Sequence, residues 1–251
     1  MMSSSSPSPS KLSHIADFLH TCPAWVLALF VGSLVAMNLL ANKSLGELPS
    51  WLALDAGFLF SWVAFALMDM TVKRFGEAAG NILSFTAIVF NLFIVLIFFL
   101  ASLLPGEWSA SYDAAGQSLP TINAALDQTF AGSWYVVFGS TVAICVSSLF
   151  NNRVNVLVAR WLHRDNFGVY ASRSFISTGL AQFVDNLTFA LIVSIPFFGW
   201  SLLQAVTCAA TGALAELLME VVFSPVSYRI VRIWEARQTG AAYLEKYVEA
   251  R

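Results

Sequence analysis

The stretch at residues 173–200 constrains this chain most, because it is long and apolar enough to cross a bilayer and yet carries Asp185 at its middle. An ionised Asp at a bilayer centre costs at least ~2.5–3.5 kcal/mol on insertion scales, so such residues usually face partners or a water-filled cavity. We therefore interpret this helix as one wall of a binding site within the membrane. On a helix with about 100° per residue, one side collects Ser174, Thr178, Gln182, Asp185, Asn186 and Phe189.

The composition indicates an integral membrane protein. Of the 251 residues, 58% are hydrophobic and only 11% are charged, whereas soluble domains usually have about 25% charged residues. The net charge of −2 gives no sign of a nucleic-acid partner. The three cysteines are isolated and lack the spacing of a metal or redox site.

The apolar runs predict an all-α, polytopic fold with six transmembrane helices, since about 20 helical residues cross the ~30 Å hydrocarbon core. If both termini are cytoplasmic, all of the 13 Lys and Arg residues except Lys43 lie in the inside segments. This bias predicts a multi-pass protein of the inner (plasma) membrane with both termini inside. The expected spans are roughly 24–41, 51–70, 80–104, 133–151, 173–200 and 201–223.

Three regions follow from this division. Residues 1–22 form a Ser/Pro-rich N-terminal tail that is expected to be disordered. Residues 23–234 form the transmembrane domain, which includes a polar outer loop at 105–132. Residues 235–251 are expected to form a cytoplasmic C-terminal helix or tail.

Catalysis within the membrane is disfavoured. All three histidines lie outside the spans, and there is no HExxH, no GxSxG, no phosphate-binding glycine loop and no Cys/His cluster. We therefore expect that the protein is not an enzyme and that it binds no cofactor and no metal ion. An aspartyl protease pair of Asp69 and Asp185 is the remaining enzyme alternative, but the two residues are expected at different depths.

The polar residues suit recognition of a small molecule. A carboxylate such as Asp185 can accept two parallel hydrogen bonds from the N–H/NH₂ edge of a guanine-like base. The alternatives are that Asp185 is a structural group satisfied by its neighbours, or that it carries a coupling proton. Aromatic side chains that could stack on such a ring are Phe58, Trp62, Phe189 and Trp200.

The last span adds two acids, Glu216 and Glu220, one helical turn apart. Each could be solvated at the inner interface or could face a ligand. Small residues at four-residue spacing in this span indicate close helix packing, within the chain or in a homodimer. Asp69 and Lys73 are spaced as an (i, i+4) ion pair at the end of the second span.

Four motifs together resemble the queuosine-precursor transporter family over about residues 25–235. They are LVAMNLLANKS with Asn38, FALMDMTVKRFG (65–76), STGLAQFVDNLTFALI (177–192) and SPVSY (224–228). The resemblance implies a six-helix inner-membrane protein, similar in fold to the substrate-binding subunits of energy-coupling-factor transporters but working without an ATPase module. Residues that match the family are Asn38, Asp69, Ser177, Thr178, Gln182 and Asp185.

The chain departs from the family pattern in the last span, where Ala215 and Glu216 stand in place of a usual Lys. The resemblance implies import of 7-cyano- or 7-aminomethyl-7-deazaguanine for tRNA modification. We expect Asp69 to support an inner gate. The alternatives are a vitamin-type carrier and a ligand-binding subunit that needs a separate ATPase module. The expected substrate-binding residues are Asp185, Gln182, Asn186, Asn38, Asp69, Thr178, Phe189, Trp62 and Glu216.

Overall fold

Helices make up almost all of the computed structural model, which describes residues 11–43, 45, 49–161 and 167–248. The polar connections hold a short 3-10 turn and a single β-bridge, Tyr112–Ser118. The elements are α1 (Lys11–Thr21), α2 (Ala24–Leu40), α3 (Phe58–Phe75), α4 (Glu77–Ser102), η1 (Ser109–Ser111), α5 (Pro120–Trp161), α6 (Phe167–Phe189), the π-helix η2 (Ala190–Ser194), α7 (Ile195–Phe198), α8 (Leu202–Ala236) and α9 (Ala241–Tyr247).

The all-α, polytopic membrane architecture is confirmed, but the count of six spans is not confirmed. Within the described ranges, four segments are long and apolar enough to cross a membrane, and α1 with α2, bent by 103°, would make five if they form one span. The second expected span coincides with α3, whose end carries Asp69, Lys73 and Arg74. With these three charges, α3 is not among the four segments. The four segments are Glu77–Ser102, Pro120–Ser147, Gly179–Phe198 and Leu202–Ala236.

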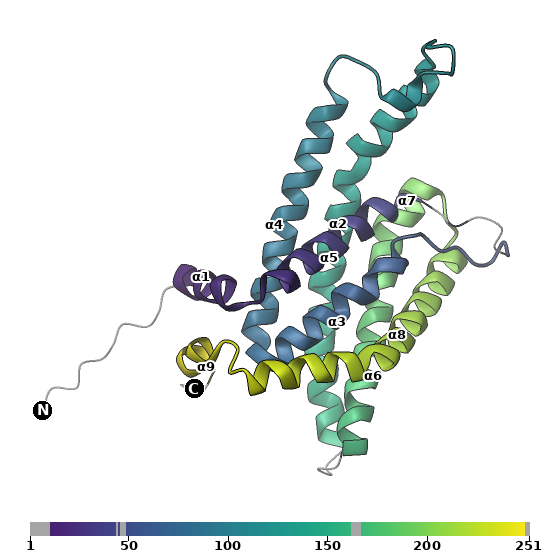
Figure 1. Ribbon diagram of the computed structural model, residues 1–251. Coiled ribbons are helices and arrows are strands. Elements are labelled where there is room, and N and C mark those ends of the chain that lie inside the picture. Colours follow the sequence, from purple (N-terminus) through teal and green to yellow (C-terminus); the bar gives the residue numbers. More distant parts are fainter. Residues whose placement is uncertain (1–10, 44, 46–48, 162–166, 249–251) are drawn as a thin grey trace, which may run out of the picture.

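The outer loop is shorter than expected, because α5 already begins at Pro120. Proline is favoured at the first position of a helix, where its missing N–H is not needed. Trp108 ties the loop to α5, since its backbone N–H donates to Asn123 Oδ1 (2.9 Å) and its ring N–H donates to Asp127 Oδ1 (2.7 Å). Figure 1 shows α4 and α5 as a hairpin that extends beyond the other helices at this end.

The prediction of a disordered tail through residue 22 is wrong for Lys11–Thr21, which form α1, while residues 1–10 lie outside the described part. The helix has a packing partner, because Phe18 is 0% exposed and its ring contacts those of Phe75 and Tyr243. Asp17 also accepts hydrogen bonds from Lys246 Nζ and the Tyr247 hydroxyl, both at 2.7 Å. Figure 1 shows α1 and α9 side by side.

The organising stretch folds as α6 followed by a π-helical turn and α7, and then turns into α8. Gly199, with a φ of 69°, occupies the left-handed conformation that ends α7. Ser201 begins α8 with a capping box, in which its hydroxyl accepts from the Gln204 N–H at 3.2 Å. Helix α8 continues through Pro225 and packs against both α3 and α6. The three helices thereby surround one space.

Candidate functional site

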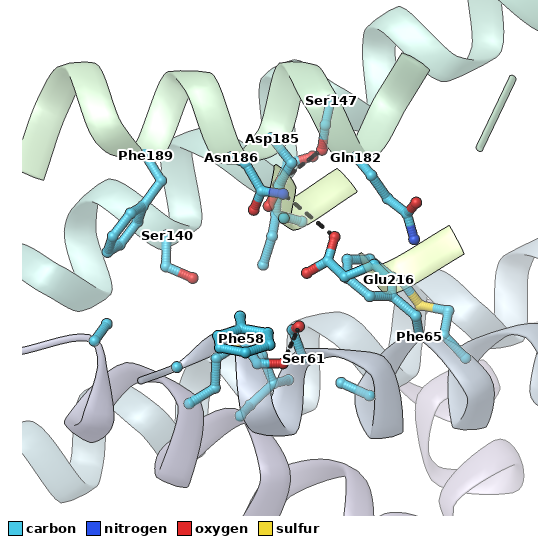
Figure 2. A pocket seen from close by; sticks show the side chains of 18 of the residues that line it. Phe58, Ser61, Phe65, Ser140, Ser147, Gln182, Asp185, Asn186, Phe189 and Glu216 are labelled. Atoms are coloured by element: carbon cyan, nitrogen blue, oxygen red, sulfur yellow. Dashed lines mark hydrogen bonds between the residues drawn. The ribbon is translucent and has the colours of Figure 1, made fainter. Parts of the chain in front are cut away.

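A cavity of about 350 Å³ lies between α2, α3, α5, α6 and α8. Pockets for small molecules in proteins usually measure ~300–1,000 Å³, so this cavity has room for a bicyclic base. Its wall is mixed, with apolar and aromatic side chains on α2 and α3 and polar ones on α6 and α8 (Figure 2). Such a wall is suited to a flat ligand with a polar edge.

Asp185, the central carboxylate of the organising stretch, lines the cavity and is held by α5. The Ser147 hydroxyl donates to Asp185 Oδ1 at 2.8 Å, so α5 fixes the carboxylate of α6 (Figure 2). A carboxylate has about four lone-pair sites. Among the described residues this is its one side-chain hydrogen bond, which leaves Asp185 with acceptor capacity for a ligand in the cavity.

Asn186 links α6 to α8 on the same side of the cavity. Its side-chain N–H donates to Glu216 Oε2 at 3.3 Å, and Glu216 is only 4% exposed. The helices can approach because α8 has Gly212 here: a Cβ on Gly212 would lie 2.9 Å from Asn186 Nδ2. The small residues in the last span therefore bring the buried acid Glu216 and the partly buried amide of Asn186 together.

Gln182 also lines the cavity and has no partner for its side chain. It is 2% exposed, and neither its Nε2 nor its Oε1 makes a hydrogen bond within the described part of the protein. Leaving a buried polar group unsatisfied costs ~1–3 kcal/mol, so such groups call for an explanation. An amide with a free donor and a free acceptor is a natural contact for a ligand.

The lining is acidic. Among the described residues that line the cavity there is no Lys, Arg or His. Asp69 forms an ion pair with Lys73 at 2.6 Å, and the Gly57 N–H donates to Asp55 Oδ1 at 2.8 Å. Glu216 has Ser61 as a neighbour within hydrogen-bonding reach in addition to Asn186, and Glu220 Oε2 has no hydrogen-bond partner within the described part. The lining acids are Asp55, Asp69, Asp185, Glu216 and Glu220.

Most of the expected site residues meet at this cavity. Trp62 is an exception, because its ring stacks on Phe223 with centroids 4.3 Å apart and does not line the cavity. Thr178 falls within α6, but its side chain lies outside the described part. The residues that do line the cavity are Asn38, Asp69, Gln182, Asp185, Asn186, Phe189 and Glu216.

Aromatic side chains from three helices, α2, α3 and α6, line the cavity. Phe58 and Phe189 both line it, and Figure 2 shows Phe189 to the left of the polar cluster and Phe58 below it. Trp200, another expected stacking residue, is buried beside Phe198 and does not line the cavity. The aromatic residues that line the cavity and could contact a flat ligand are therefore Phe30, Phe58, Phe65 and Phe189.

Sequence reasoning missed several lining residues, chiefly Asp55, Ser61, Ser140 and Ser147. The serines carried no signal, because small hydroxyls are common in membrane helices and hydrogen-bond to their own backbone, as Ser61 does to Phe58 O at 3.0 Å. Asp55 did carry one, since a carboxylate at the edge of an apolar span is costly. Within the described residues, no group of three or more His, Cys, Asp or Glu is arranged to hold a metal ion.

Comparison with known proteins gives the family. The family model described as "putative vitamin uptake transporter" matches residues 55–230. The chain belongs to the putative vitamin uptake transporter family. This confirms the resemblance found in the motifs, since the queuosine-precursor transporters are that family. No curated protein and no solved structure matched the chain.

Membership of this family indicates the general role of the protein. It is a multi-pass membrane protein of a transporter family, which implies a carrier of a small molecule and not an enzyme. The matched range includes α3, α5, α6 and α8, which carry most of the cavity wall. The cavity is therefore the candidate transport site.

Proposed function

We propose that this transporter imports a 7-deazaguanine precursor of queuosine, either the 7-cyano or the 7-aminomethyl compound. The observation that carries the proposal is the pair of incompletely satisfied groups on α6, the Asp185 carboxylate and the Gln182 amide. They lie one helical turn apart and both line the cavity. Together they present acceptors and a donor to one edge of a ligand.

A guanine-like edge complements this pair. Its adjacent N–H and NH₂ groups can donate in parallel to the two oxygens of Asp185. The neighbouring carbonyl of the base can accept from the Gln182 amide N–H, which has no other partner. Phe58 and Phe189 offer faces for the ring, since stacked aromatic contacts add about 0.5–1.5 kcal/mol beyond burial. The remaining expected residues, Asn38 and Asp69, would line the path of the substrate, with Asp69 at an inner gate.

A second candidate, a vitamin, is favoured by the family's own description. Flat vitamins with a polar edge would meet the same side chains. A panel of labelled vitamins and labelled precursors in the binding assay separates the two candidates, because a vitamin carrier would bind one of the vitamins more tightly than either precursor.

The test is uptake of labelled 7-cyano- and 7-aminomethyl-7-deazaguanine into proteoliposomes that hold only this protein, with and without a proton gradient. Saturable uptake that unlabelled precursor competes would support the proposal and would make a partner ATPase unnecessary. Binding without uptake would indicate a ligand-binding subunit that needs an energising partner. Absence of binding of both precursors would refute the proposal.

We also propose that both termini lie in the cytoplasm. The support is the basic bias of the sequence, with Lys43 alone among the Lys and Arg residues in an outside segment. In the structure the N-terminal α1 packs on the C-terminal α9, so the two ends lie on the same side of the molecule (Figure 1). Reporter fusions at each terminus test this orientation. The homodimer stays a prediction.

A further inference from the structure

We propose that Glu216 binds a positively charged group on the substrate, so that the cavity selects a base with a protonated amine over the same base with a neutral substituent. The inference rests on the proposed function and narrows it to the 7-aminomethyl compound. It concerns a part of the ligand that Asp185 and Gln182 do not contact.

The first support is the place of Glu216 in the cavity. Its carboxylate points into the space between Asn186 and Phe58 (Figure 2), and it is almost completely removed from solvent. The hydrogen bond from Asn186 occupies one oxygen, at 3.3 Å. Ser61 lies within hydrogen-bonding reach on α3, but its hydroxyl already donates to Phe58 O. The Glu216 carboxylate therefore has acceptor capacity that faces the cavity.

The second support is the absence of a compensating cation. Asp55 and Asp185 both lie close enough to repel a negative charge on Glu216. No Lys, Arg or His lines the cavity among the residues that the structure describes. Lys73 forms an ion pair with Asp69 and so does not compensate the charge of Glu216. A buried carboxylate without a cation is unfavourable unless it is protonated or gains a partner. A cationic ligand would supply that partner.

The third support is independent of the acids. The amide of Gln182 is 2% exposed and has no hydrogen-bond partner among the described residues, so a ligand with hydrogen-bonding groups would satisfy it. Gln182 and Asp185 lie on α6, whereas Glu216 lies on α8. A ligand whose ring edge contacts α6 can therefore present a side arm to Glu216 on the other helix. An alkylamine at the end of that arm is protonated at neutral pH and donates a charge-assisted hydrogen bond.

The first experiment varies the ligand and uses the wild-type protein. Affinities are measured at neutral pH for three compounds: 7-aminomethyl-7-deazaguanine, its N-acetyl derivative, which keeps the arm and loses the charge, and the 7-cyano compound. We expect the aminomethyl compound to bind at least about tenfold more tightly than either neutral compound. Equal affinities would overturn the inference and leave the proposed function standing. Failure of all three to bind would instead refute the proposed function.

The second experiment varies the protein. Glu216→Gln keeps the shape and the hydrogen-bonding reach of the side chain and removes its charge, and Glu245→Gln on the exposed face of α9 removes the same charge outside the cavity. We expect Glu216→Gln to bring the three affinities to within about threefold of one another, and Glu245→Gln to keep the wild-type preference. Retained binding of the 7-cyano compound shows that the variant is folded. A preference unchanged in Glu216→Gln would overturn the inference. If Glu216→Gln binds none of the compounds, the affinities of the wild-type protein for the three compounds decide whether the inference holds.

Discussion

Replacing Gly212 by Ala tests the close approach of α6 and α8 that builds the site. A Cβ at this position would lie 2.9 Å from Asn186 Nδ2, which is closer than ordinary van der Waals contact. The amide would have to move, and it would lose its 3.3 Å hydrogen bond to Glu216. Gly179→Ala is the matched control, because its Cβ would meet only Leu217 Cδ2 at 3.6 Å.

The magnitudes can be worked from these contacts. An alanine inside a helix is better than glycine by roughly 0.5–1 kcal/mol, and this gain applies to both variants. Gly212→Ala adds an overpacking cost of about 1–3 kcal/mol and the loss of a hydrogen bond of about 1 kcal/mol. We therefore expect Gly179→Ala to be slightly more stable than wild type, and Gly212→Ala to be less stable than Gly179→Ala by about 2–4 kcal/mol.

The assay is thermal unfolding of the purified protein in detergent, together with ligand affinity. For a chain of this size about 1 kcal/mol corresponds to roughly 2–4 °C, so the midpoints of the two variants should differ by several degrees. Affinity for the 7-deazaguanine precursor should fall about tenfold in Gly212→Ala and stay unchanged in Gly179→Ala. The reasoning would be refuted if both variants behaved alike, because the contact with Asn186 would then not constrain the helices.

Three further predictions concern other contacts. Ser147→Ala removes the hydrogen bond that fixes Asp185 at 2.8 Å, so precursor affinity should fall by about tenfold or more, and an unchanged affinity would show that α5 does not position the carboxylate. Gly240→Ala should lower the unfolding midpoint by several degrees, because Gly240 has a φ of 76° and a Cβ there would lie 2.5 Å from the Phe75 ring. A midpoint equal to that of the wild type would contradict this packing. Hydrogen bonds from its lysine and tyrosine partners on α9 lower the pKa of Asp17. The docking of α1 on α9 should therefore be complete at pH values above the ordinary aspartate pKa and should weaken as the pH falls through the lowered pKa. Proteolysis at α1 should show this pH dependence in the wild type and no such dependence in Asp17→Asn.

The sequence alone determined the membrane class and the side of one helix that matters. Long apolar runs with few charges have no stable alternative to burial in lipid, so the all-α, polytopic architecture could be predicted without any knowledge of packing. Helical periodicity placed Gln182, Asp185 and Asn186 on one face of α6, and the structure brings all three to one cavity. The motifs likewise placed the chain in its family.

The tertiary structure decided what that face meets. Ser147 lies 38 residues before Asp185 and Glu216 lies 30 residues after Asn186, so no local pattern links them. Periodicity tells which side chains share a face, but the partner across a helix interface depends on the packing of both helices. The same reason explains why the sequence does not predict α1. This helix is stabilised by the burial of Phe18 against α3 and α9, which are distant in the sequence. The acidic character of the cavity is also a tertiary property, since its five carboxylates come from different parts of the chain and share one space only in the folded protein.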